Sequence, residues 1–322
     1  MADSAQSFCM LRLSWSLSFD IITSFIFGLD AGTNLLDDLS QIDTIASFYD
    51  DRYPAEAFWK KEAPWVSNVL TKCGWSPLGR NKRYQLAREY LEAWTLRMCS
   101  AANTTLDRAQ PPLPESGAYP VVYAQIKKCV DDEYPILDSE SKMKMIASEL
   151  FDHLSSAHEV VGLMLAYTLR FIGENQTAQR KLREEVRRLR SKDLSALPSA
   201  ATLGELHYLS AVISESFRMR PNGTPLPRIT PHDRTVRLGE FNHIPGGVRV
   251  NTYQWFLHRD PCIWSDADKW VPERWLNHDG QFEAKSSHEP DRVLWPFCSG
   301  PRMCLGNHLT DYSTFRRGAN LL

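Results

Sequence analysis

Apolar residues recur at helical spacing through residues 140–173 of this chain. Successive members are three, four or seven positions apart, so they form one apolar face: Met143, Ile146, Leu150, Leu154, Val161, Leu165 and Leu169. We therefore predict one helix over this range, long enough to cross a whole domain. The stretch Ser155–Val161 at its centre holds small residues and one acid, Glu159. We interpret Glu159 as a buried carboxyl that meets a ligand, although the segment is equally typical of a core helix with one solvated glutamate.

Similar periodicity predicts that most of the chain before residue 220 is helical. The predicted helices cover residues 8–28, 39–49, 55–72, 79–101, 118–130, 140–173, 175–191 and 204–219. Between Pro221 and Val250, proline and glycine become frequent and β-branched residues come in short runs. This change predicts strands at Thr235–Leu238 and Val248–Thr252, around the turn Ile244–Gly247. Helices followed by a few short strands predict a mainly α fold with a small β part, of the α+β class.

Residues 8–29 are apolar enough to raise the question of a membrane anchor. Arg12 and Asp20 interrupt the run, and its longest uncharged piece is Ile21–Leu29. That piece is far shorter than the ~20 residues that a spanning helix needs. No basic region or small-residue cleavage site marks a signal peptide. We therefore predict a buried core helix here and expect no transmembrane anchor.

Composition adds an ordinary globular balance to this picture. The 322 residues are 43% hydrophobic and 24% charged, with a formal net charge of −2. Such a chain can bury a large core, and nucleic acid is not expected as its main partner. The seven cysteines are odd in number and scattered, which argues against a disulfide framework and favours a reducing compartment with mostly inert, buried thiols. Cys298 and Cys304 are six positions apart with no second pair nearby, which does not match a zinc spacing.

One cysteine stands in an unusual loop, Phe297–Gly306, which reads FCSGPRMCLG. Gly300 and Gly306 allow tight turns and a close approach to a ligand. Backbone N–H groups of such a loop can point at the sulfur of Cys304, and Arg302 can neutralise an anionic group nearby. The loop can hold a thiolate under a large flat cofactor. The alternative is a buried cysteine in an ordinary turn.

The pattern Phe-x-x-Gly-x-Arg-x-Cys-x-Gly resembles the haem-binding loop of the cytochrome P450 family, of the microsomal or fungal type. All five fixed positions of that pattern are filled. The resemblance implies that the Cys304 thiolate is the axial ligand of the iron of haem b. It also implies that Phe297, Gly300 and Gly306 shape the cofactor site around this ligand.

Two further motifs follow in the family's order. Glu215 and Arg218 match its E-x-x-R helix, and Arg274 matches the arginine of its P-E-R-F/W element. The resemblance implies that these three residues form a buried structural triad, which locks the cysteine loop against the core and is costly to break. It also implies that Arg228 and Arg302 each bind a haem propionate, since a guanidinium suits a carboxylate. A surface role for Arg228 is the alternative.

The long helix resembles the family's central helix, whose Ala/Gly-Gly-x-Asp/Glu-Thr-Thr/Ser motif lies over the oxygen site. Ser156–Glu159 fit its first four positions loosely, which places Ala157 beside the haem and makes Glu159 a candidate proton relay. Val160 stands where the family has a threonine that helps to deliver protons. The segment His258–Pro261 also resembles the family and is interpreted as a structural turn. Candidate walls of the substrate pocket are Ala157, Val160, Asn222, Gly223 and Thr224.

The resemblance covers about residues 13–309 and implies a single partial domain over residues 1–322. Its parts are a helical region 1–139, the central helix 140–173, the segment 204–309 from the E-x-x-R helix to the haem loop, and a divergent tail 310–322. The family's membrane anchor, its early strands and one haem-holding helix have no counterpart in the sequence, and neither do most of the helix after the haem loop and the hairpin that follows it. We therefore expect a truncated gene product.

The family's activity implies a haem-dependent monooxygenase, in secondary metabolism or xenobiotic oxidation. Such an enzyme takes electrons from NADPH through NADPH-cytochrome P450 reductase and inserts one atom of dioxygen into a small hydrophobic substrate. The alternative is a non-catalytic remnant that binds haem weakly or not at all. The family usually resides at the endoplasmic reticulum membrane. Without an anchor, this chain is expected to be cytoplasmic or peripheral.

Overall fold

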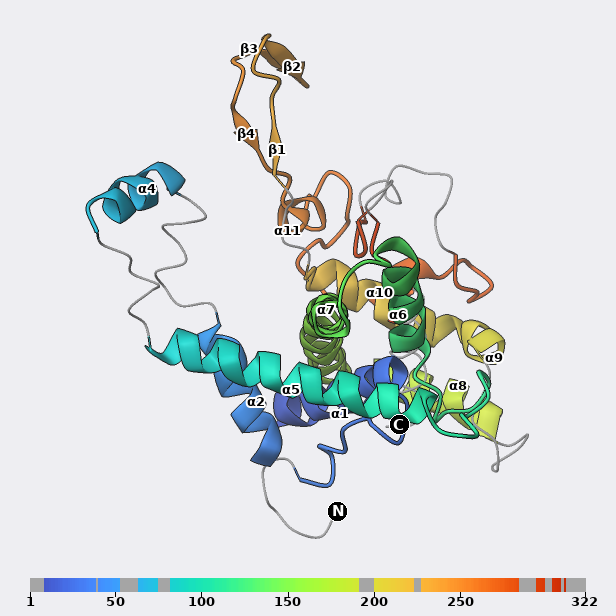
Figure 1. Cartoon of the computed structure of the whole chain (residues 1–322). Coiled ribbons are helices and arrows are strands. Elements are labelled where there is room, and N and C mark those ends of the chain that lie inside the picture. Colours follow the sequence, from blue (N-terminus) through green and yellow to red (C-terminus); the bar gives the residue numbers. More distant parts are fainter. Residues whose placement is uncertain are drawn as a thin grey trace. The chain divides into compact units, whose positions relative to one another are not determined.

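The computed structural model describes residues 9–38, 40–52, 63–74, 82–190, 200–222, 227–283, 294–298, 303–307 and 310 (Figure 1). The chain divides into two compact units, Met1–Leu163 and Met164–Leu322. The long helix α7 (Ser139–Glu174) begins in the first unit and ends in the second. Each unit is described by itself.

The first unit is helical. Besides the N-terminal part of α7, it contains α1 (Met10–Phe27), α2 (Ser40–Asp51), α4 (Pro64–Lys72), α5 (Lys82–Leu106) and α6 (Val121–Glu133). Helix α1 packs against α2, α5 and α6, and α5 packs against α2 and α6. The apolar faces of these helices bury residues that include Phe19, Ile26, Phe27, Leu91, Leu150 and Leu154.

Small residues allow α1 to lie close to α7. Gly162 of α7 has no room for a side chain, because a Cβ atom there would lie 2.4 Å from Cδ1 of Trp15. The hydroxyl of Ser18 donates a hydrogen bond to the carbonyl of His158 at 2.8 Å. By length and composition, α1 is a weak candidate for a membrane span, as buried core helices also are. Eight of its residues are buried in the unit, including the serines at positions 14, 16 and 18.

Over its described residues, the second unit combines helices with two small antiparallel sheets. Helix α10 (His207–Met219) packs against α8 (Gln176–Arg190) and the 3-10 helix η2 (Pro272–Trp275). Two short helices, α9 (Ala200–Gly204) and α11 (Gln254–Leu257), also belong to this unit. Strand β1 (Arg228–Ile229) pairs with β4 (Arg249–Val250), and β2 (Val236–Leu238) pairs with β3 (Phe241–Ile244). The core between α8, α9 and α10 includes Leu182, Leu203, Leu209, Val212 and Phe217.

The fold class predicted from the sequence is confirmed: the chain is mainly helical with a small β part. Helix α7 extends one residue beyond the predicted range at each end. Both predicted strands form, as β2 and β4, but they do not pair with each other. Strand β2 pairs with β3 and β4 pairs with β1, and neither partner was predicted from the sequence. Of the predicted helix 55–72, residues 55–62 lie outside the described part of the chain.

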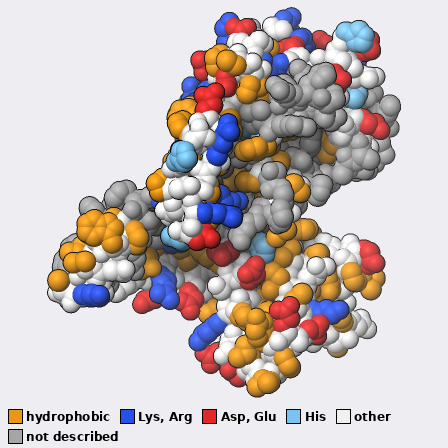
Figure 2. All heavy atoms as spheres, turned by 90° about the horizontal axis from the view of Figure 1, so that it is seen from above, with side chains coloured by type: hydrophobic (Ala, Val, Ile, Leu, Met, Phe, Trp, Pro, Cys, Tyr) orange, Lys and Arg blue, Asp and Glu red, His pale blue; other side chains and the backbone are white. Residues whose placement is uncertain are grey.

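The expectation of mostly buried thiols is wrong. All seven cysteines carry free thiols, and only Cys99 is buried. Most of the others stand at helix caps or in turns, where the chain meets solvent. On the face shown in Figure 2, acidic and basic side chains are interspersed, in keeping with the small net charge.

Candidate functional site

The carboxylate of Glu215 is the centre of a buried network in the second unit. Glu215 and Arg218 lie one turn apart on α10, and both side chains are fully buried. Arg218 donates to the two carboxylate oxygens through Nε at 2.9 Å and Nη2 at 2.8 Å. Arg274 of η2 donates through Nε at 3.1 Å, and its side chain is only 10% exposed. The structure therefore brings together all three residues of the predicted triad.

Two groups that the sequence did not indicate complete the shell of this carboxylate. The indole Nε1 of Trp275 donates to Oε2 of Glu215 at 3.0 Å, and the backbone N–H of Val271 donates to Oε1 at 2.8 Å. An ionised carboxylate offers about four lone-pair positions. Hydrogen-bond donors of the protein thus replace water around the carboxylate of Glu215, which offsets the cost of burying its charge.

The guanidinium of Arg218 also reaches the loop that follows the β-strands. Its Nη1 donates to the carbonyls of His258 at 2.6 Å and Ala267 at 2.7 Å, and Nη2 donates to the carbonyl of Lys269 at 2.9 Å. With the two bonds to Glu215, each of its five N–H donors has an oxygen acceptor. Arg218 therefore fixes α10 to residues 258–269.

His258 carries this connection towards the cysteine loop. Its side chain is fully buried, and its Nε2 accepts a hydrogen bond from the backbone N–H of Trp295 at 3.2 Å. The side-chain amide of Gln254 donates to the carbonyl of Trp295. The sequence had indicated only a structural turn at His258–Pro261. A buried histidine that anchors a distant segment leaves no local signal, because its partner is 37 residues away.

The cysteine loop follows directly. The backbone N–H of Cys304 donates to the carbonyl of Phe297 at 2.9 Å. The Phe297 ring packs edge-on against Phe217 of α10, with ring centroids 5.2 Å apart. The thiol of Cys304 is exposed, and a Cβ atom on Gly306 would lie 3.8 Å from its sulfur. The loop thus holds a free, accessible sulfur on a backbone that is tied to the E-x-x-R helix.

The centre of α7 differs from the prediction at Glu159, which is exposed rather than buried. His158 takes the buried position, with its Nδ1 3.1 Å from the carbonyl of Leu154 and its ring edge-on to those of Phe19 and Tyr49. Consecutive helical residues are ~100° apart, so the two side chains leave the helix on different faces. Burial lowers the pKa of His158 to about 4.

Comparison with known protein families decides the identity of this arrangement. The family model for "Cytochrome P450" matches residues 3–315, nearly the whole chain. The chain belongs to the cytochrome P450 family. The family implies a haem cofactor, and the mainly α fold agrees with this membership.

Several curated cytochrome P450 relatives resemble part of the chain. A cytokinin hydroxylase of Arabidopsis thaliana is 34% identical over 165 residues, which are 51% of this chain and 29% of that protein. An (S)-N-methylcanadine 1-hydroxylase of Papaver somniferum is 33% identical over 52% of this chain and 29% of its own length. A cytochrome P450 monooxygenase of Aspergillus terreus is 29% identical over 55% and 35%. The chain therefore spans well under half the length of these relatives.

The described residues of the cysteine loop fit a haem. A thiolate is a known axial ligand of haem iron, and the Cys304 sulfur is free of disulfide bonds and open to solvent. Gly306 places no side chain beside that sulfur, so its flank stays open to a flat ligand. Gly300, Arg302, Gly223 and Thr224 lie outside the described residues.

The other predicted contacts remain expectations. Arg228 is an exposed residue of β1, opposite Val250, and its role as a propionate ligand stays a prediction. Ala157, Val160 and Asn222 are half-buried, and their place in the substrate pocket also stays a prediction.

Proposed function

We propose that the chain carries the haem-thiolate part of a cytochrome P450 monooxygenase. Cys304 would hold the haem iron through its thiolate, while Arg228 and Arg302 would bind the propionates. Phe297, Gly300 and Gly306 would shape the loop around the ligand. When bound, the haem supplies the chemistry: with electrons from NADPH-cytochrome P450 reductase it activates dioxygen, and one oxygen atom enters a small hydrophobic substrate.

One observation carries this proposal: the exposed thiol of Cys304 sits on a loop that is fixed at its base. The hydrogen bond from Cys304 to Phe297 closes the loop, and Phe297 packs on Phe217 of α10. A ligand on a backbone held in this way needs little reorganisation when it binds a cofactor. The buried network of Glu215, Arg218 and Arg274 stabilises the helix that supports it.

The residues at the centre of α7 suit proton delivery through water rather than through a buried carboxyl. Glu159 is exposed, so water can reach its carboxylate. The next residue, Val160, has no hydrogen-bonding group in its side chain. We expect proton delivery in this protein to depend on Glu159 and water, since the hydroxyl of the family's motif is missing at Val160.

The test is oxygen transfer by the full chain. The chain is loaded with haem, mixed with NADPH-cytochrome P450 reductase, NADPH and isotopically heavy dioxygen, and given a panel of small hydrophobic molecules. The proposal predicts a product that contains one heavy oxygen atom and is formed only with NADPH. Cys304→Ala should abolish it. Product formation that survives Cys304→Ala would contradict the proposed role of this residue.

A further inference from the structure

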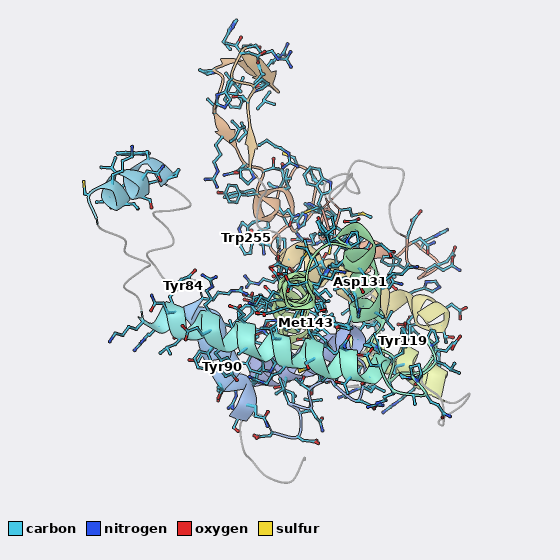
Figure 3. All side chains as sticks on the ribbon, in the orientation of Figure 1. Tyr84, Tyr90, Tyr119, Asp131, Met143 and Trp255 are labelled. Atoms are coloured by element: carbon cyan, nitrogen blue, oxygen red, sulfur yellow. The ribbon has the colours of Figure 1, made fainter. Side chains whose placement is uncertain are left out.

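The first unit contains a pocket of about 440 Å³ that lies apart from the cysteine loop along the chain. Its volume falls within the roughly 300–1,000 Å³ of small-molecule sites. Residues of α5 and α7 form its walls, and Arg52, which follows α2, completes them. Tyr84, labelled in Figure 3, lies near the start of α5 and is part of the lining.

The lining combines an apolar wall with an excess of positive charge. Leu91, Leu96, Ala147 and Phe151 supply the apolar surface. The charged lining residues are three cations and one acid: Arg52, Arg88, Lys144 and Glu92. A pocket of this composition favours a molecule with an apolar body and a negatively charged group.

Arg52 is held in position rather than extended into water. Its guanidinium lies 3.8 Å from the ring centre of Tyr49 and 5.3 Å from that of Phe151. Its Nη1 donates a hydrogen bond to the hydroxyl of Ser155 at 3.2 Å. A guanidinium fixed on aromatic faces loses little conformational entropy when it binds a carboxylate.

Arg88 provides the second positive charge at the open side of the pocket. Its side chain is exposed, as are those of Glu92 and Ser148, so solvent and ligands can enter there. Lys144 contributes less, because its Nζ is 2.7 Å from the carboxylate of Glu140. The attraction for an anion therefore depends on Arg52 and Arg88, and Glu92 opposes it.

We infer that this pocket binds a small amphipathic carboxylate, with its carboxylate between Arg52 and Arg88 and its apolar body against Leu91 and Phe151. The planar fork of an arginine matches the two oxygens of a carboxylate. Leu91 is buried and Phe151 is half-buried, and together they offer an apolar surface to the body of the molecule. This binding does not depend on haem or on the proposed oxidation.

The experiment is calorimetric titration of the full chain, without haem, with three probes that share one apolar body. The probes are 4-phenylbutanoate, its uncharged amide, and the corresponding phenylbutylammonium cation. We expect the carboxylate to bind most tightly and the cation most weakly. Equal affinity for the three probes, or no heat with the carboxylate at millimolar concentration, would overturn the inference.

Matched variants on α5 locate the site. Arg88→Gln should weaken phenylbutanoate binding by about tenfold, because it removes one charge-assisted contact. Glu92→Gln should tighten it, because it removes a negative charge from the lining. Arg97→Gln lies on the same helix, is also exposed and does not line the pocket, so it should leave affinity unchanged.

Arg52→Gln is also expected to weaken phenylbutanoate binding. Thermal unfolding of this variant shows whether the lower affinity reflects a loss of folded structure. Arg88 is exposed, so its variant is expected to fold and keeps the test decisive. If Arg88→Gln and Arg97→Gln bind phenylbutanoate equally, the proposed site is wrong.

Discussion

The backbone N–H of Trp295 donates a hydrogen bond to Nε2 of His258 at 3.2 Å. The carbonyl of the same histidine accepts a hydrogen bond from Arg218 at 2.6 Å. The buried residue His258 therefore joins the network around Glu215, through its backbone carbonyl, to the segment that leads into the cysteine loop, through its side chain. This path supports the proposal that the network stabilises the position of Cys304.

Replacement of His258 by phenylalanine tests this connection. Phenylalanine keeps an aromatic ring but offers no acceptor, so the N–H of Trp295 loses its partner. We expect haem affinity to fall by about tenfold or more, as for other residues that support a metal ligand. Haem titration monitored by absorbance measures the change. His278→Phe is the control, since that side chain is 88% exposed; equal haem affinities of the two variants would contradict the connection.

Glu215→Gln tests the buried network itself. The change removes the charge that both Arg218 and Arg274 require, and we expect the free energy of unfolding to fall by about 3–5 kcal/mol. Urea unfolding measures it. The control is Glu174→Gln, which breaks a pair with Arg170 whose side chains are 59% and 65% exposed. That variant should lose less than about 1 kcal/mol, and a similarly small loss for Glu215→Gln would show that the network does not stabilise the unit.

His158 should make the stability of the first unit depend on pH. Burial lowers its pKa from 6.5 to about 4, so the unfolded chain binds a proton that the folded chain does not bind between these values. Stability should therefore decrease as the pH falls through this window, by up to about 3 kcal/mol.

Unfolding midpoints of wild type and His158→Leu, measured between pH 7 and about pH 4, isolate this contribution. The decrease should be smaller in His158→Leu. Ser156→Ala, a change at an exposed position of the same helix that carries no titratable side chain, should keep the slope of the wild type. Identical slopes for all three proteins would rule out a buried neutral His158.

Gly162→Ala tests the close approach of α1 to α7. The added methyl group would lie 2.4 Å from Cδ1 of Trp15 and 3.1 Å from the carbonyl of Ser14. We expect a loss of about 1–3 kcal/mol from this overpacking. Gly173→Ala on the same helix meets no atom within 4 Å and should gain up to about 1 kcal/mol from helix propensity. Thermal unfolding distinguishes these opposite signs, and a stabilised Gly162→Ala would refute the close contact.

Periodicity predicted α7 because its apolar face is continuous. The same spacing also indicates which residue is buried at the centre of the helix. His158 lies four residues after Leu154 and three before Val161, so it belongs to the buried face. The family motif indicated Glu159 instead as the residue that faces the ligand. The motif did indicate Glu215, Arg218 and Arg274, which the structure brings together.

The remaining contacts depend on residues that are far apart in the sequence. Strands β1 and β4 have two residues each, which is too short to show an alternation of apolar and polar residues. Their pairing is set by tertiary structure rather than by local preference. The bonds of Trp275 to Glu215 and of Trp295 to His258 join positions 60 and 37 residues apart. Only the folded chain shows such pairs.

The central claim is that Cys304 is the ligand of haem iron. The most direct measurement is the absorbance spectrum of the haem-loaded chain after reduction and addition of carbon monoxide. The account predicts the red-shifted Soret band typical of thiolate ligation in the wild type and in Cys298→Ser, which alters an exposed cysteine of the same loop. Cys304→Ser should lack that band. If the two variants give the same spectrum, Cys304 is not the ligand.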